Sequence, residues 1–377
     1  MSAGDRHPIH VLVVDDSAVV REIMTGVLSQ EPGLRVAAAA DPLIAMQKMS
    51  QQRPDVIVLD LEMPRMDGRT FLHKIMTEDP IPVIICSAHT GQETSRGLQA
   101  LEEGAVDVVT KPRLGVQKFL HESAVMLIDA VRAAAGAHPR QRRAAFFRPS
   151  PLLRSAGAMP PVGRKPALRS VRHDVVAIGA STGGTEALRL VLELMPVDAP
   201  GLVVVQHMPE GFTTAFARRL NELCRIEVKE AADGDRVAAG RALIAPGNRH
   251  VLVHRVGTHY IVEVNDGALV SRHRPSVDVL FRSVATAAGA NAIGVIMTGM
   301  GSDGAEGLLA MQNAGAWTIA QDEASCVVFG MPKEAIERGA VNQVVPLSSI
   351  PKLILSAVNG APRAFDAISN KSNAGRF

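Results

Sequence analysis

Acidic, hydroxyl and basic side chains follow a series of short apolar runs in the first third of this 377-residue chain. Asp15 and Asp16 follow the first run, Asp60 follows a later one, and Ser87 and Lys111 follow two more. Carboxylates brought within a few ångströms of one another repel unless a cation lies between them, and an oxygen-rich site of this kind suits Mg²⁺. A lysine and a hydroxyl beside the cation would neutralise a phosphoryl group and leave one aspartate as nucleophile. The pattern therefore predicts a Mg²⁺-dependent phosphoryl-acceptor site.

Each of these residues also has a purely structural explanation. Asp16-Ser17 could cap a helix, Asp60 could lie in a turn, and Lys111-Pro112 is a common loop sequence. The ordered set, placed at successive strand ends, favours the phosphoryl site over these explanations.

A second set of candidate residues begins at a glycine-rich turn that carries Ser181 and Thr182 and follows the apolar run Val175–Ala180. The turn alone fits either a phosphate cradle at a helix N-terminus or a nucleophile on a tight strand-to-helix turn. The next apolar run ends in Gln206-His207, whereas a dinucleotide site needs an Asp or Glu there. We therefore favour Ser181 as nucleophile and His207 as its general base.

Asp303 follows a third apolar run and precedes a helical pattern. In isolation, a helix cap is the better explanation for Asp303. As part of the set, it could accept the ring N–H of His207 and stabilise the imidazolium that forms during attack by Ser181. Backbone N–H groups of the surrounding glycine-rich stretch could face a developing oxyanion. The order Ser, His, Asp differs from the order in α/β-hydrolases, which predicts a different fold with a similar site.

Runs of Val and Ile alternate with amphipathic stretches along both halves of the chain, and Ser17 is placed to cap the first helix. Strands that alternate with helices predict an α/β fold with helices on both faces of a parallel sheet. Strands are expected in the first half at Ile9–Val14, Val56–Leu59, Val83–Cys86 and Val106–Val109. In the second half they are expected at Val175–Ala180, Leu202–Gln206, Arg241–Ala245, Ala292–Met297 and Ala316–Ala320, with helices at Glu186–Leu194, Phe212–Leu223, Val277–Ala288 and Gly304–Ala314.

One stretch of the second half departs from this alternation. Residues His250–Leu269 alternate between apolar and polar side chains and contain Asn265-Asp266-Gly267. This pattern predicts an inserted β-hairpin whose turn lies at Asp266-Gly267.

The middle of the chain has the composition of a linker. Between residues 130 and 173 there are ten Lys or Arg, six Pro and no Asp or Glu. We favour a solvated tether over a contact with nucleic acid or an acidic protein. The predicted organisation is a first domain at 1–130, a linker at 131–172, a second domain at 173–360 and a frayed tail at 361–377.

Composition excludes several classes of protein. Aromatic residues are only 3% of the chain, so stacking platforms for nucleic acid are scarce. The three cysteines lie far apart and favour a reducing, cytoplasmic location over a disulfide framework or zinc site. We expect no signal peptide and no insertion into a membrane.

The first half resembles the response-regulator receiver domain, through VLVVDDS, VIVLDLEMPRMDG, VIICSAHT and GAVDVVTKP in that order. The resemblance implies a flavodoxin-like fold with Asp60 as phosphoacceptor. It also implies a Mg²⁺ site formed by Asp16, Asp60 and the backbone of Glu62, which Asp15 assists through water.

The same resemblance implies that Ser87 and Lys111 contact the phosphoryl group. Many receivers carry Tyr or Phe three positions before the lysine, and this chain has Val108 there. The phosphorylation chemistry is unaffected, but the usual aromatic route for passing on the signal is missing.

The second half resembles the CheB family of chemotaxis methylesterases, through GASTGG, QHMP, APGNRH, HRPSVDVLF, TGMGSDGA and DEASCVVFGMP in order. The resemblance implies a Rossmann-like, doubly wound parallel sheet. On matching positions, Ser181 is the nucleophile, His207 the base and Asp303 its orienting partner. Met300 would be a backbone oxyanion donor, and Thr182 would lie beside the nucleophile.

The family hydrolyses γ-glutamyl methyl esters on the cytoplasmic helices of chemoreceptors to glutamate and methanol, and many members also deamidate receptor glutamines. The resemblance therefore implies a cytoplasmic, monomeric enzyme of chemotaxis adaptation that needs no cofactor for ester hydrolysis. Its partners would be methylated chemoreceptors and a histidine kinase as phosphodonor. The receiver would cover the catalytic edge until Asp60 is phosphorylated.

Other functions remain as alternatives. The Ser181 turn could hold an anion or a receptor segment without turnover, which would make the chain a binding module. A dinucleotide-dependent oxidoreductase is disfavoured by Gln206-His207. A DNA-binding output is the least favoured, because the second half is acidic and shows no helix-turn-helix signal.

Overall fold

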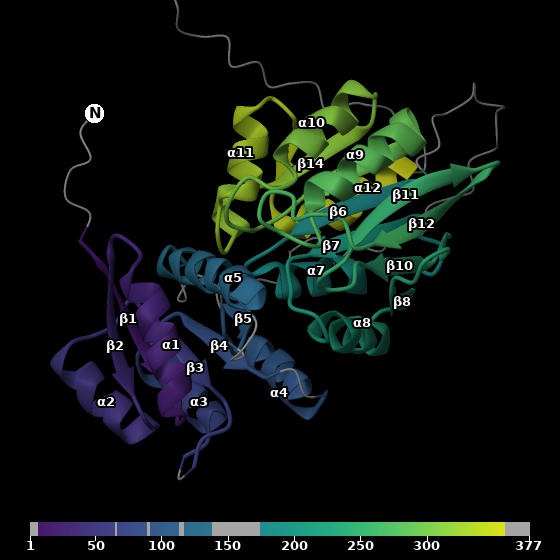
Figure 1. The fold of residues 1–377 in the computed structure, drawn as a ribbon. Coiled ribbons are helices and arrows are strands. Elements are labelled where there is room, and N and C mark those ends of the chain that lie inside the picture. Colours follow the sequence, from purple (N-terminus) through teal and green to yellow (C-terminus); the bar gives the residue numbers. More distant parts are fainter. Residues whose placement is uncertain (1–6, 65, 89–90, 113–116, 138–173, 359–377) are drawn as a thin grey trace, which may run out of the picture.

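The computed structural model describes residues 7–64, 66–88, 91–112, 117–137 and 174–358. Within these ranges the chain forms two α/β domains, each built on a parallel sheet (Figure 1). The predicted fold class is therefore confirmed. Nearly all of the predicted linker and the whole predicted tail lie outside the described residues. Among the residues described, no helix combines the length and the apolar character needed to span a membrane.

The N-terminal sheet has the strand order β2-β1-β3-β4-β5 and is parallel throughout. This is the flavodoxin-like order. Its strands are β1 (Ile9–Val14), β2 (Leu34–Ala39), β3 (Val56–Asp60), β4 (Val83–Ser87) and β5 (Asp107–Thr110). Its helices are α1 (Ala18–Ser29), α2 (Pro42–Gln51), α3 (Gly68–Glu78), α4 (Gly91–Glu102) and α5 (Gln117–Ala135). Helix α5 thus continues five residues past the domain boundary predicted at residue 130.

Local side-chain chemistry fixes where three of these helices begin. The Ser17 hydroxyl accepts the Val20 N–H at the start of α1, as the sequence predicts. Asp41 and Asp67 accept backbone N–H groups at the starts of α2 and α3. Side-chain acceptors at these positions satisfy N–H groups that have no partner within the helix.

The C-terminal sheet has the order β15-β14-β13-β6-β7-β10-β8, and all of its pairings are parallel. Its strands are β6 (Val175–Ala180), β7 (Gly201–Gln206), β8 (Glu227–Glu230), β10 (Arg241–Ile244), β13 (Ala292–Ile296), β14 (Trp317–Gln321) and β15 (Gln343–Val345). Its helices are α7 (Gly184–Glu193), α8 (Phe212–Leu223), α9 (Val277–Ala288), α10 (Ala305–Asn313), α11 (Met331–Glu337) and α12 (Ile350–Val358). Helices α7, α8 and α12 share one apolar cluster with the sheet, and α9, α10 and α11 share another, so the sheet is covered on both faces.

The predicted hairpin exists, but its predicted turn is wrong. Strand β11 (His250–Val256) pairs with β12 (His259–Asn265), so the chain reverses at Gly257-Thr258. Gly257 supplies the left-handed backbone that a two-residue hairpin loop requires, with a φ of 60°. The Asn265-Asp266-Gly267 sequence forms a turn after β12, in which the Asn265 side chain accepts the Gly267 N–H over 3.1 Å. A short strand, β9 (Arg236–Val237), completes this antiparallel sheet.

Strand β6 lies in the sheet between β7 and β13. The register pairs Ala180 with Gln206, and Gly179 with Ile296. The residues that follow these three strands therefore meet at one edge of the sheet. In doubly wound sheets, ligands bind at such a point, where the strand order reverses.

The two domains contact each other through the side of the N-terminal domain that carries α4, β5 and α5 (Figure 1). Gly97 of α4 packs so closely on α8 that a Cβ there would lie 2.8 Å from the Phe212 ring. The Arg219 guanidinium donates to Glu102 over 2.9 Å across the same contact. One apolar cluster contains buried residues of both domains, among them Val108 and Phe212.

Candidate active site and phosphorylation site

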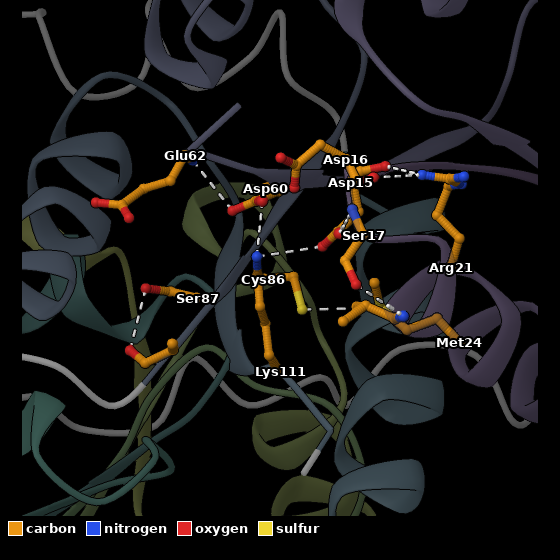
Figure 2. A network of polar contacts seen from close by, with 12 residues as sticks. Asp15, Asp16, Ser17, Arg21, Met24, Asp60, Glu62, Cys86, Ser87 and Lys111 are labelled. Carbon is orange, nitrogen blue, oxygen red and sulfur yellow. Dashed lines mark hydrogen bonds and ion pairs between the residues drawn. The ribbon is translucent and has the colours of Figure 1, made fainter. Parts of the chain in front are cut away.

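The predicted phosphoryl-acceptor residues gather at the carboxyl edge of the N-terminal sheet (Figure 2). The carboxylates of Asp15, Asp16 and Asp60 each offer an oxygen within 4.8 Å of the others. Asp15 and Asp60 are buried, whereas Asp16 is exposed. The Glu62 N–H donates to Asp60 over 3.1 Å.

Lys111 follows β5 and reaches across to these carboxylates. Its Nζ lies 2.6 Å from Asp60 Oδ2 and 3.3 Å from Asp15 Oδ2 (Figure 2). Ser87 ends β4 and is buried, and its hydroxyl donates to the Ala88 carbonyl over 3.4 Å. The strand ends thus bring Lys111 into contact with Asp60, and the Lys111 N–H donates to the Ser87 carbonyl over 2.9 Å. Among the described residues, the Ser87 hydroxyl makes no hydrogen bond to Lys111 or Asp60.

Burial dominates the electrostatics of this carboxylate cluster. Burial raises the pKa of Asp60 to about 6, although hydrogen bonds from Lys111 and the Glu62 backbone act in the opposite direction. Burial also raises the pKa of Asp15, although the ion pair with Lys111 acts in the opposite direction. Three converging carboxylates face a single lysine, and this oxygen-rich set fits the ligands that a divalent cation prefers.

The glycine-rich turn after β6 holds Ser181 by its backbone. The Ser181 N–H donates to the Thr298 carbonyl over 3.0 Å, and the Ser181 carbonyl accepts from the Gly184 N–H and the Gln206 side chain. Gly183 has a φ of 77°, and a Cβ there would lie 2.5 Å from Val327 Cβ. Only glycine fits this position, so the turn presents Ser181 at a fixed place on the sheet edge.

His207 and Asp303 form a hydrogen-bonded pair beside this turn. His207 Nε2 lies 2.8 Å from Asp303 Oδ2, and the Nδ1 atom is buried with no hydrogen-bond partner. Since Asp303 can only accept when ionised, Nε2 carries the proton and Nδ1 keeps its lone pair. Ser181 and His207 line the same cavity but make no hydrogen bond to each other in this structure.

The side chain of Asp303, a residue that lies between β13 and α10, reaches the N-terminus of α9. These surroundings explain why its carboxylate is ionised. Its carboxylate accepts the Ser276 hydroxyl over 2.7 Å and the N–H groups of Val277 and Asp278. Burial alone would raise the pKa of Asp303, but hydrogen bonds from His207 and Ser276 lower it to about 2. The helix N-terminus adds a favourable field for a negative charge. Asp303 therefore stays ionised at any pH at which the enzyme would work.

This depressed pKa predicts a loss of stability in acid. Ionised Asp303 should contribute about 2 kcal/mol to the free energy of unfolding above pH 4, because its pKa falls from 3.8 in the unfolded chain to about 2. That contribution should disappear as the pH falls from about 4 to 2. Denaturant unfolding of wild type and Asp303→Asn between pH 2 and 5 checks this. If the free energy of unfolding falls equally steeply with decreasing pH in both proteins, the prediction is wrong.

A cavity of about 460 Å³ connects the two domains at Ser181. The C-terminal domain lines it with Ser181, Thr182, His207, His273, Met300 and Asp303 among others, and the N-terminal domain lines it with residues of β5 and α5. The Thr182 hydroxyl donates to the Asp107 carboxylate over 2.8 Å, which ties the nucleophile turn to β5. Met300 lines the cavity, and its N–H donates no hydrogen bond to another of the described residues. The predicted residues thus share one space, which the N-terminal domain closes on one side.

Comparison with known proteins assigns each of the two domains to a family. A family model described as CheB methylesterase matches residues 176–354, and one described as response regulator receiver domain matches residues 11–120. A protein-glutamate methylesterase/protein-glutamine glutaminase of Anaeromyxobacter dehalogenans is 59% identical over 352 residues, covering 92% of this chain and 96% of that protein. The chain belongs to the CheB family. A protein-glutamate methylesterase/protein-glutamine glutaminase of Geobacter metallireducens is 57% identical over 349 residues, covering 92% of this chain and 98% of that protein.

A solved CheB structure covers the second domain alone. The catalytic domain of Thermotoga maritima CheB methylesterase is 38% identical and covers 48% of this chain and 97% of its own, with a TM-score of 0.48. The two relatives above, which each cover 92% of this chain, extend the family membership over both of its halves.

The structure of this CheB-family chain also brings residues to the cavity that sequence reasoning did not single out. His273 stacks on His207, Ser276 holds Asp303, and Asp107 contacts Thr182. His273 and Ser276 lie within the HRPSVDVLF motif, so the motif carried a signal that was not resolved to single residues. Asp107 belongs to the other domain, and its contact with Thr182 has no signature in the sequence.

Proposed function

We propose that this chain is a phosphorylation-regulated serine esterase that hydrolyses glutamate γ-methyl esters on the cytoplasmic helices of chemoreceptors, in chemotaxis adaptation. The same site would deamidate receptor glutamines, as the names of its relatives indicate for those proteins. We place it in the cytoplasm as a monomer that binds no nucleic acid. The observation that carries the proposal is the His207–Asp303 pair in one cavity with Ser181, in a chain that matches CheB relatives over both domains.

The chemistry of ester hydrolysis follows from the protonation states. His207 Nδ1 takes the proton of the Ser181 hydroxyl while Oγ attacks the ester carbonyl, and ionised Asp303 stabilises the imidazolium. Collapse of the tetrahedral intermediate breaks the bond to methoxide, which leaves as methanol with the proton from His207. Water then attacks the acyl-enzyme by the same route and releases glutamate. With a glutamine substrate, ammonia leaves in place of methanol.

The negative oxygen of each tetrahedral intermediate needs donors. The unpaired Met300 N–H at the cavity wall is the donor that we assign to it. An oxyanion donor of this kind lowers the activation free energy by roughly 3 to 4 kcal/mol in a serine enzyme. In this proposal, ester hydrolysis needs no cofactor.

In the receiver, Asp60 would accept a phosphoryl group from a histidine kinase. Asp15, Asp16, Asp60 and the backbone of Glu62 would hold Mg²⁺, whose positive charge offsets the charge of the phosphoryl oxygens. Lys111, already 2.6 Å from Asp60, would pair with one of those oxygens, and Ser87 would donate to another. The convergence of the three carboxylates, whose charge Lys111 offsets only in part, supports this assignment of the metal site.

The test is methanol release from a chemoreceptor helix fragment that carries glutamate methyl esters. We expect release by the full chain, stimulated by acetyl phosphate with Mg²⁺. The matched control is Asp60→Asn, which should keep the unstimulated rate and lose the stimulation. If the full chain binds the fragment but releases no methanol under any of these conditions, a binding module replaces the esterase.

The contact between Thr182 and Asp107 predicts how the receiver restrains the enzyme. Asp107→Ala removes the acceptor of the Thr182 hydroxyl and should raise the unphosphorylated rate of methanol release about tenfold. The reason is that one hydrogen bond to a charged group contributes roughly 1.5 kcal/mol net, which corresponds to about a factor of ten. The fully phosphorylated rate should stay unchanged.

The control for Asp107→Ala is Asp79→Ala, which removes a carboxylate that pairs with Arg53 at the protein surface. This variant should leave both rates as they are in the wild type. An unphosphorylated rate that does not rise in Asp107→Ala would show that this hydrogen bond does not hold the domains in the closed arrangement.

A further inference from the structure

The ring of His273 lies flat against the ring of His207. The two ring centroids are 3.8 Å apart and the ring planes differ by 8°. His273 comes from the loop between β12 and α9, whereas His207 follows β7, so the stack joins two separate segments of the C-terminal domain. Both side chains line the cavity that contains Ser181.

The loop of His273 fixes its ring without help from His207. His273 Nδ1 lies 2.6 Å from the Ser271 carbonyl oxygen, so this nitrogen carries a proton and donates it. Paired backbone hydrogen bonds between Val270 and His273 close the loop. Ser271 and Arg272 have φ values of 51° and 66°, a left-handed conformation that costs energy in residues other than glycine. Strain of this kind persists where the surrounding structure holds a functional residue in place.

His273 is neutral in this environment. Burial lowers its pKa to about 3, and the nearby His207 acts in the same direction. Among the charged groups around it, Asp303 acts the other way and Arg272 acts with His207. At neutral pH, His207 therefore faces an uncharged aromatic surface.

The stack also decides against a metal site formed by the same residues. His207, His273 and Asp303 each offer a ligand atom within 4.8 Å of the others. The lone pair of an imidazole nitrogen lies in the ring plane, however, and two nearly parallel planes 3.8 Å apart do not converge on one ion. The arrangement suits contact between ring faces and not shared coordination.

His207 needs such a contact, because only one edge of its ring is held by a hydrogen bond. Nε2 is bound to Asp303, while Nδ1 has no partner and must point at the Ser181 hydroxyl during attack. A ring held at one atom can still tilt. A flat neighbour on one face removes that freedom, and an aromatic face also stabilises the imidazolium that forms when His207 takes the proton.

We propose that His273 is a positioning residue for the serine esterase, whose flat, uncharged ring holds His207 in the orientation that directs Nδ1 at Ser181 and supports the imidazolium form. This inference rests on the proposed function for its reaction. Its central claim, that the ring face of His273 activates the nucleophile through His207, can be measured without a methyl ester.

The test compares His273→Phe with His273→Leu in the full chain. Both variants lose the hydrogen bond to Ser271, and both are apolar, but only Phe keeps a flat ring. We expect His273→Phe to retain kcat within about fivefold of the wild type. His273→Leu should lose kcat by roughly 100-fold with KM unchanged, since a misplacement of about 1 Å can cost that much.

A third variant and a second readout complete the test. His273→Asn can still donate to Ser271 but has no ring, so it should lose as much kcat as His273→Leu. The rate at which a small fluorophosphonate labels Ser181 should follow the same order, with wild type and Phe fast and Leu and Asn slow. Thermal melting shows which variants are folded, and the comparison uses those that are.

Two results would overturn the inference. One is that His273→Phe loses as much activity as the folded ring-free variants, and the other is that those variants label at the wild-type rate. Wild type that labels with the fluorophosphonate but releases no methanol would refute the proposed methylesterase. The labelling rates would in that case still decide the role of His273.

Discussion

Replacing Ser181 with alanine is expected to lower the rate of methanol release by about 10⁴- to 10⁶-fold, because the acyl-enzyme can no longer form. Among the residues that the structure describes, none offers a side chain that hydrogen-bonds with the Ser181 hydroxyl, so its removal should leave the fold unchanged. Binding of the methylated receptor fragment should also be retained. Methanol release and fragment binding, measured on the same preparation, check both parts.

The matched control for Ser181→Ala is Ser325→Ala. The Ser325 hydroxyl is half-buried, donates to Asp322 and accepts from the Leu347 N–H, and Ser325 does not line the cavity. Its methanol release should stay near that of the wild type even if its melting temperature falls. A Ser181→Ala protein that releases methanol at the wild-type rate would exclude this serine as the nucleophile.

Replacing Asp303 with asparagine is expected to lower kcat by about 10⁴-fold, the effect that a wrong histidine tautomer has in a serine enzyme. Asparagine can donate its amide protons to His207 Nε2, which moves the ring proton to Nδ1. A protonated Nδ1 cannot accept the proton of Ser181. KM should change far less than kcat, since Asp303 is only 1% exposed and acts through His207.

Asp278→Asn provides the comparison for Asp303→Asn, because Asp278 is also a buried carboxylate at the start of α9. It accepts the Gly307 N–H over 2.7 Å and makes no contact with His207. Both variants should lose stability, but only Asp303→Asn should lose kcat by orders of magnitude. Equal losses of kcat in the two variants would mean that Asp303 acts by holding α9 and not through His207.

Several elements of the fold could be predicted to the residue because local signals coincide. Helix α9 begins after Ser276, whose hydroxyl caps it, and the apolar spacing ends at Ala288 before Gly289. Helix α8 also has the limits that the apolar spacing predicts, Phe212–Leu223, although no side chain caps its start at Gly211. The hairpin turn was not, because Asn265-Asp266-Gly267 is the stronger turn signal in the sequence. The chain had already reversed at Gly257, which fits the positive φ there.

Some residues of the candidate active site could also be predicted from the sequence, and others could not. Ser181, His207 and Asp303 each follow an apolar strand, so the sequence could place them at one sheet edge before the strand order was known. The strand order β13-β6-β7 then makes them neighbours. His273 comes from an irregular loop with left-handed residues, and no periodicity predicts where such a loop places a side chain. Asp107 reaches Thr182 only through the packing of one domain on the other.

Strand β5 has a consequence for how far a signal must travel. Asp107 begins this strand and Lys111 follows its end, so the contact with the nucleophile turn and the contact with Asp60 are four residues apart. At about 3.3 Å per residue, that separation is roughly 13 Å of extended backbone. The residue that contacts the phosphoacceptor and the residue that contacts the nucleophile turn are therefore joined by one short strand. If both proposed sites act as we expect, the covalent path between them is this single strand, and that path needs no aromatic side chain at position 108.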